Sequence, residues 1–95
     1  MIASFGGRDT EHLFRFRTRP PRMPPDIVKA ALRRLDYLDH AAELSDLRIP
    51  PGNRLETLRG SFAGFYSIRA DDQWRVIFRW LDGNALDVRV IDYHS

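Results

Sequence analysis

The chain has 95 residues, of which 43% are hydrophobic and 29% are charged, and it contains no cysteine. This length is typical of one soluble domain with a modest core, which we place at residues 1–95, and the lack of cysteine excludes disulfides, thiolate catalysis and zinc-finger sites. The net charge is only +2, but residues 1–34 carry eight basic and three acidic groups, a difference of +5, so this block predicts a polyanionic or acidic partner.

The beginning of the chain predicts a short strand, a short helix and a stiff connector. Its first ten residues contain no apolar run long enough for a signal peptide or a membrane span, so we expect a cytoplasmic protein. Residues 2–5 read as a strand, and "DTEHLF" is typical of a helix start, where Asp9 or Thr10 provides the cap. Residues 17–26 contain four prolines and therefore form neither a helix interior nor a central strand.

A longer helix is predicted over residues 25–42. Pro24 and Pro25 suit its first turn, where the backbone N–H that proline lacks would have no partner within the helix. Apolar residues recur at spacings of three and four and form one stripe: Val28, Ala31, Leu32, Leu35, Leu38 and Ala42. We therefore expect this helix to pack on a sheet through that stripe.

After a turn-rich stretch the apolar period changes to two, which predicts strands at residues 54–59, 65–70, 73–81 and 85–93. The segment "QWRVIFRWL" is the clearest, because its large apolar residues alternate with arginines. In the last strand the alternation predicts that Leu86, Val88 and Val90 share one face. The order of elements predicts an α+β fold, with a short N-terminal strand and two or three helices packed on one face of a mainly antiparallel sheet of four to five strands.

The other face of that sheet is expected to be open and basic. If the hairpins pair in register, arginines on neighbouring strands share this face: Arg69, Arg75, Arg79 and Arg89. Like charges on neighbouring strands repel, so such a cluster favours a bound anion. Two interpretations of Arg75 stay open, since it either pairs with Asp87 or another acid, or clamps a phosphate.

The chain ends in "VIDYHS", where the last predicted strand runs directly into Asp92, Tyr93 and His94. Strand alternation places Asp92 and His94 on one side and Tyr93 on the other. His94 titrates near neutral pH, so it could transfer a proton while Asp92 sets its orientation. Spacing alone favours a structural or solvent-exposed role for these residues. Glu56 is open to a similar pair of interpretations, as a surface glutamate or as a general base.

No metal or cofactor site is predicted. The acidic candidates, Asp71, Asp72 and Asp92, have neither the spacing nor the number of ligands that a metal ion needs. The sequence also contains no phosphate-binding glycine loop and no nucleophile elbow. His12 and His40 lie on predicted helices, away from any cluster, and are interpreted as structural.

The stretch "PPGNRLETLRGSFAGFYSIRADDQWRVIFRW" and the closing "IDYH" resemble the HigB group of the RelE-like toxins. The start "MIASF" and the predicted long helix also fit, so the resemblance covers nearly the whole chain. It implies a RelE/ParE-like fold and the toxin of a type II toxin–antitoxin pair, a metal-independent endoribonuclease that cleaves mRNA in the A site of the translating ribosome. The implied partner is a HigA-like helix-turn-helix antitoxin, with operator DNA contacted only through the toxin–antitoxin complex and no membrane contact.

The resemblance also implies which residues form the site. The matched positions are Glu56, Arg59, Arg75, Asp92, Tyr93 and His94. Arg59 stands at a basic position that is lysine in some members, and Glu56 stands where some members carry histidine. Phe62 and Phe65 replace polar residues that are common in the motif. The departure at Glu56 affects which residue acts as the second acid or base. The departures at Phe62 and Phe65 affect which side chains lie beside the RNA.

Cleavage by such a set would use the RNA 2′-OH as the nucleophile. We expect Arg75, helped by Arg59 or Arg69, to stabilise the charge that develops on the scissile phosphate. Arg79 is expected to contribute to RNA or phosphate binding.

Proton transfer is assigned to the remaining matched residues. His94 is the expected proton carrier, with its orientation set by Asp92, and Glu56 is the expected base. Tyr93 is expected to stack on a base or to donate to a phosphate oxygen.

Three other functions remain open from the sequence. A ParE-like toxin of the same general fold would inhibit DNA gyrase without cutting RNA. A plain RNA-binding module would hold phosphates through its arginines and leave the RNA intact. A catalytically weakened toxin would act mainly in antitoxin binding and in control of its own operon.

Overall fold

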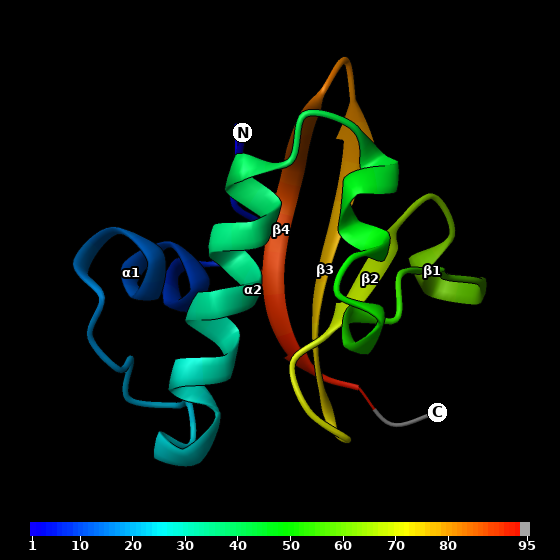
Figure 1. The fold of residues 1–95 in the computed structure, drawn as a ribbon. Coiled ribbons are helices and arrows are strands. Elements are labelled where there is room, and N and C mark those ends of the chain that lie inside the picture. Colours follow the sequence, from blue (N-terminus) through cyan, green and yellow to red (C-terminus); the bar gives the residue numbers. More distant parts are fainter. Residues whose placement is uncertain (94–95) are drawn as a thin grey trace.

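The computed structural model describes residues 1–93, in which two helices cover one face of a four-stranded sheet (Figure 1). The helices and strands are α1 (Arg8–Phe16), α2 (Val28–His40), β1 (Glu56–Thr57), β2 (Tyr66–Arg69), β3 (Trp74–Leu81) and β4 (Asn84–Asp92). Short 3-10 helices precede α2 and connect it to β1, and another lies between β1 and β2. In Figure 1, α1 and β1 lie at opposite sides of the molecule. None of the helices in residues 1–93 is long and apolar enough to cross a membrane.

The sheet has the order β1-β2-β3-β4, and all three neighbouring pairs are antiparallel. The predicted first strand is present as two isolated parallel bridges to β4, Ile2 to Ala85 and Phe5 to Val88. The predicted α+β arrangement is therefore confirmed, with a minimal fifth segment at the β4 edge. The strand predicted over residues 54–59 is reduced to two residues, because Arg54 lies in the left-handed region with φ 47° and Gly60, with φ 65°, turns the chain away.

The core lies between α2 and the inner face of the sheet, as the helical stripe predicts. Its fully buried members include Leu35 and Leu38 from α2 and Phe78 from β3. The alternation predicted for the last strand is wrong at its start, because Asp87 has φ 53° and the register with β3 shifts there. This bulge inserts one residue, so Ala85 rather than Leu86 faces the core together with Val88.

A surface ion pair joins the two helices. Arg17 ends α1 in the left-handed conformation, and its Nη2 lies 2.7 Å from Oδ2 of Asp36 on α2. The hydrogen bond from Arg17 lowers the pKa of the Asp36 carboxyl, and the same bond raises the pKa of Arg17. Both side chains are more than 40% exposed, so solvent screening limits the pair to about 1 kcal/mol at most.

Gly6 is predicted to be a stability determinant, because the chain passes very close to β4 there. A Cβ on Gly6 would lie 2.9 Å from the carbonyl oxygen of Asp87 and 2.8 Å from Cγ of Arg89. The Asp87 oxygen belongs to the backbone of β4, so Gly6→Ala is expected to lower the free energy of unfolding by about 1–3 kcal/mol. Chemical denaturation measures this loss.

Gly52→Ala is the matched control, because a Cβ on Gly52 would meet nothing within 4 Å. We expect it to change the free energy of unfolding by less than about 0.5 kcal/mol. Equal losses in the two variants would show that the close approach at Gly6 does not constrain the fold.

Candidate active site

A pocket of about 420 Å³ opens on the sheet face that the helices leave uncovered. It is lined by Glu56, Thr57, Leu58, Arg59, Ser67, Arg75 and Tyr93. Four of the residues predicted from the sequence, two arginines, a glutamate and a tyrosine, thus meet in one place although they are up to 37 positions apart in the chain. The lining places two guanidinium groups, a carboxylate and a phenol around a space large enough for part of a nucleotide.

Strand register explains why these side chains converge. Glu56 on β1 is the Cα partner of Ser67 on β2, and Ser67 in turn pairs with Ile77 on β3. Arg75 lies two residues before Ile77 and therefore shares its face. Ser67 and Ile77 are 2% and 0% exposed, so this face is less open than the sequence predicted. Ser67 instead contributes to the lining of the pocket.

The β2–β3 turn positions the two neighbouring arginines. The carbonyl oxygen of Asp71 accepts hydrogen bonds from Nη1 of Arg75 at 2.7 Å and from Nε of Arg69 at 3.1 Å. Oδ1 of Asp71 accepts from the backbone N–H groups of Gln73 and Trp74 at 2.8 and 2.7 Å, which fixes the turn itself. The sequence predicts a hairpin turn at Asp71 and Asp72, which is confirmed, but it does not indicate that the Asp71 carbonyl holds two arginines.

Arg75 has no carboxylate partner among residues 1–93. Asp87, its proposed partner in one of the two interpretations above, lies beside Arg79 instead, with Oδ2 3.4 Å from Nε. Within the described part of the chain, Arg75 bonds only to backbone carbonyls, those of Asp71 and Trp74. No acid among residues 1–93 neutralises its remaining donors, which favours the phosphate-binding interpretation.

The end of β4 separates Tyr93 from Asp92. The backbone N–H of Tyr93 donates to the carbonyl oxygen of Gln73 at 2.8 Å, and its side chain lines the pocket. Asp92 is exposed and accepts a hydrogen bond from Nε2 of Gln73 at 3.0 Å, and it is not part of the lining. His94 lies outside the described residues, so its predicted place on the side of Asp92 stays a prediction.

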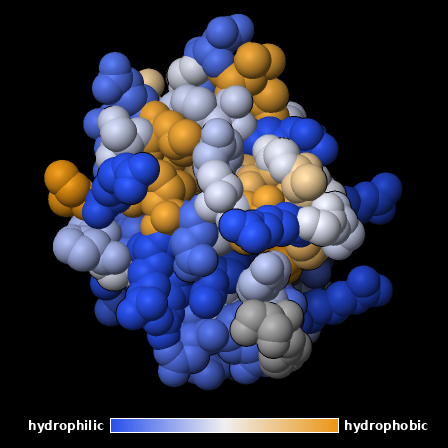
Figure 2. Space-filling model, turned by 90° about the vertical axis from the view of Figure 1, so that its right-hand side faces the viewer, coloured by the Kyte–Doolittle hydropathy of each residue, from blue (hydrophilic) through white to orange (hydrophobic). Residues whose placement is uncertain are grey.

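Two other predicted phosphate-binding residues lie beside the pocket rather than in it. Arg69 forms an ion pair with Asp72 and is the cross-strand partner of Arg75. Arg79 lies over the ring of Phe65, with the guanidinium carbon 4.4 Å from the ring centroid. Figure 2 shows the side of the molecule that carries β1, where hydrophobic residues (orange) reach the surface in patches bordered by hydrophilic side chains (blue).

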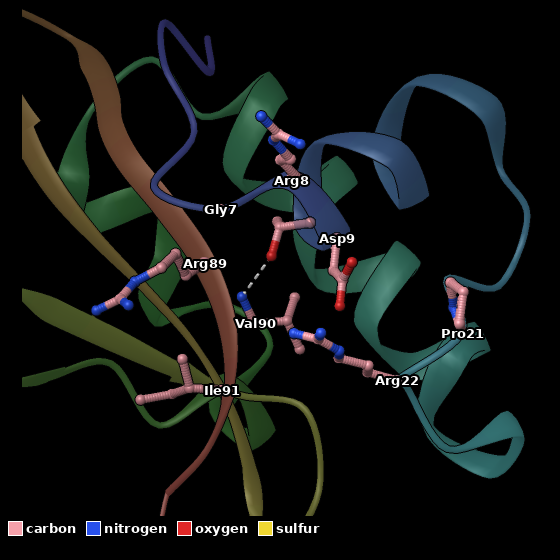
Figure 3. Close-up of a pocket in the computed structure, with 9 residues that line it drawn as sticks. Gly7, Arg8, Asp9, Pro21, Arg22, Arg89, Val90 and Ile91 are labelled. Carbon is pink, nitrogen blue, oxygen red and sulfur yellow. Dashed lines mark hydrogen bonds between the residues drawn. The ribbon is translucent and has the colours of Figure 1, made fainter.

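A larger pocket, of about 770 Å³, lies between the start of α1 and β4, and none of the predicted catalytic residues within residues 1–93 lines it (Figure 3). The hydroxyl of Thr10 accepts a hydrogen bond from the backbone N–H of Val90 at 2.9 Å, which joins α1 to the strand. In Figure 3 the side chain of Arg22 points toward Val90, whereas those of Arg8 and Arg89 point away from it. The three arginines around this pocket therefore do not converge on one point.

Comparison with known proteins identifies similar toxins. Residues 4–94 match the family described as RelE-like toxin of type II toxin-antitoxin system HigB. The chain is 44% identical over 95 residues to Toxin HigB-1 of Vibrio cholerae serotype O1, covering all of this chain and 99% of the relative. It is 30% identical over 94 residues to Endoribonuclease HigB of Proteus vulgaris, covering 99% of this chain and 100% of the relative.

Solved structures support the same fold. A crystal structure of YafQ from E. coli strain BL21(DE3) superposes with a TM-score of 0.52 at 14% identity, and a mutant of E. coli YafQ superposes with 0.54 at 16%. Both alignments cover 95% of this chain and 91% of the other. At such low identity the likeness concerns the arrangement of helices and strands.

Proposed function

The chain belongs to the RelE-like HigB toxins of type II toxin–antitoxin systems, and from this premise we propose that it is an endoribonuclease that cleaves mRNA on the translating ribosome. The observation that carries the proposal is the pocket in which Arg59 and Arg75 lie with Glu56 and Tyr93. The relative from Proteus vulgaris that aligns along almost its whole length is named an endoribonuclease. The pocket contains a carboxylate and two guanidinium groups, which suit a general base and the stabilisation of phosphate charge.

The proposed reaction uses a nucleophile that the RNA supplies. The 2′-oxygen attacks the neighbouring phosphorus, a bond forms between them, and the bond from phosphorus to the 5′-oxygen breaks. One protein group takes the proton of the 2′-OH, and another gives a proton to the leaving 5′-oxygen. The phosphoryl oxygens gain negative charge on the way, and fixed cations stabilise that charge most effectively.

Arg75 is the best-positioned cation for this role. Its Nη1 is held by the Asp71 carbonyl at 2.7 Å, so the guanidinium is already oriented before RNA binds. Such preorganisation avoids the energetic cost of reorienting the group during the reaction. Arg59 lines the same pocket and adds a second positive charge.

Glu56 is the proposed base, because its carboxylate is the only acidic side chain in the pocket lining among the described residues. His94 is the proposed acid, since it follows Tyr93 directly in the chain. Asp92 is proposed to orient His94, and Gln73 holds the Asp92 carboxylate at the edge of the site. Tyr93 is proposed to contact the base or the phosphate of the bound nucleotide.

The family implies an antitoxin partner. We propose that this antitoxin is a HigA-like helix-turn-helix protein and that operator DNA is contacted only through the toxin–antitoxin complex. The ribosome with mRNA in its A site is the proposed second partner, and the cytoplasm is the proposed location. The basic block in residues 1–34 is consistent with contact to polyanionic RNA.

A reconstituted translation reaction tests the proposed function. Purified protein is added, and new mRNA ends are mapped with and without ribosomes. We expect new ends only when ribosomes are present. Intact mRNA together with loss of gyrase supercoiling would support a ParE-like inhibitor. Salt-sensitive RNA binding without new ends would support a plain RNA-binding module, and operator repression without cleavage would support a weakened toxin.

A further inference from the structure

Three aromatic side chains form a continuous row that begins inside the pocket. The ring of Tyr93, which lines the pocket, lies 6.2 Å from the ring of Phe62, and Phe62 lies 6.2 Å from Phe65. The guanidinium of Arg79 closes the row, 4.4 Å above the Phe65 ring. We call Tyr93, Phe62 and Phe65 the aromatic row.

The aromatic row does not serve the hydrophobic core. All three rings are partly exposed, and none belongs to the core cluster or to the apolar residues packed against it. Tyr66, Trp74 and Trp80 are partly exposed as well, yet they pack against the core. Core packing therefore explains those three side chains and leaves the aromatic row unexplained.

The backbone holds the row in place beside the site. Phe62 ends the 3-10 helix Gly60–Phe62, which starts directly after Arg59, a residue of the pocket lining. The N–H of Phe65 donates to the carbonyl of Phe62 at 3.0 Å, and the N–H of Leu58 donates to the carbonyl of Phe65 at 2.9 Å. The row is thus fixed relative to the pocket by the hairpin that joins β1 to β2.

We propose that the aromatic row is a stacking site for the unpaired RNA bases next to the scissile phosphate, so that Phe62 and Phe65 mark the path of the RNA away from the pocket. Unpaired bases stack on aromatic rings and on arginine planes in single-strand RNA recognition. The inference rests on the proposed function and names the substrate element that this part of the site binds.

Arg79 takes a different role under this inference from the one expected from the sequence. Its guanidinium lies on Phe65 while its Nε faces Asp87 at 3.4 Å, so its charge is partly compensated. Because the Arg79 guanidinium is partly neutralised by Asp87 and stacked on Phe65, it is better suited to stacking on a base than to binding a phosphate. Arg79 therefore adds a planar group at the Phe65 end of the row.

The test places 2-aminopurine, a fluorescent base quenched by stacking, at each position flanking the cleavage site of an mRNA on the ribosome. A 2′-deoxy nucleotide at the scissile bond prevents reaction. We expect wild-type protein to change the fluorescence at a flanking position, with Phe62→Leu and Phe65→Leu weakening binding of that RNA roughly 5- to 100-fold. Leucine keeps apolar volume and removes the ring, and Phe62→Trp is expected to restore the signal.

Phe16→Leu is the matched control, because Phe16 is 64% exposed and lies on α1, at the opposite side of the molecule from β1 (Figure 1). It is expected to match the wild type in fluorescence and in cleavage. The stacking inference alone would be overturned if the wild-type protein cleaves mRNA and both row variants match it in fluorescence change and in base preference. No cleavage by the wild type on natural mRNA would overturn the proposed function, which keeps the two failures distinct.

Discussion

Arg75→Ala is expected to lower the rate of mRNA cleavage on the ribosome by about 10²–10³-fold, the range seen when one fixed donor is removed from a charged transition state. Arg75 combines two properties that no other arginine on this face combines in residues 1–93. It lines the pocket, and its guanidinium is fixed by the backbone carbonyl of Asp71. Removing it leaves the pocket with Arg59 as its remaining arginine.

Two further variants make this prediction specific. Arg75→Lys keeps one positive charge but loses the planar fork, so we expect it to recover only part of the lost rate. Arg48→Ala removes an exposed arginine from the 3-10 helix Leu44–Arg48, which lies outside the basic block and does not line the pocket, and this variant is expected to cleave at the wild-type rate. Single-turnover rates on programmed ribosomes measure all three. A wild-type rate for Arg75→Ala would remove this residue from the site.

The sequence predicts most of the sheet because alternation is a local signal. Residues 73–81 and 65–70 are confirmed as strands to within a residue or two, since their alternation buries Ile68, Val76 and Phe78 on the inner face. The bulge at Asp87 is not visible in the pattern, because a positive φ at an aspartate depends on how β4 meets β3 and the N-terminal segment. The error at Leu86 follows directly from that one residue.

In the site, too, the local sequence predicts which residues take part but not which long-range contacts they make. The register of three strands brings Glu56, Arg59 and Arg75 together, and the family motif had already selected these residues. The partners of Arg79 and Arg75 could not be predicted, because they depend on which way two long side chains turn on the same face. Turn chemistry in "ADDQW" was the available signal for Asp71.

The roles of Phe62 and Phe65 could be inferred only from their contacts in the structure. In the sequence they are departures from a motif, with no indication of what they face. In the structure they continue from Tyr93 without touching the core. Hydrophobic residues that pack against no core on a face rich in arginine indicate a ligand with both flat apolar surfaces and negative charge, and single-stranded RNA has both.

Glu56→Gln is expected to lower the cleavage rate by about 10²–10⁴-fold, because the amide keeps the shape of the side chain but cannot accept the proton of the 2′-OH. Thr57→Ala changes the neighbouring residue of the same pocket lining and is expected to stay within a few-fold of the wild type. The comparison separates loss of the base from general disturbance of β1. Rates measured across a pH series with cleavage rate-limiting provide the test.

Glu56→His distinguishes two ways in which this pocket could work, because some HigB toxins carry histidine at the matched position. If the position needs only a proton acceptor at the right place, histidine should restore cleavage well above the level of Glu56→Gln, with a rate that rises through neutral pH as the imidazole loses its proton. If Gln, His and Glu at position 56 all give the same rate, the carboxylate is not the base. Proton transfer would then rest on the C-terminal residues alone. Arg59 and Arg75 would still stabilise the phosphate charge, and Glu56 would line the pocket without taking part in the reaction.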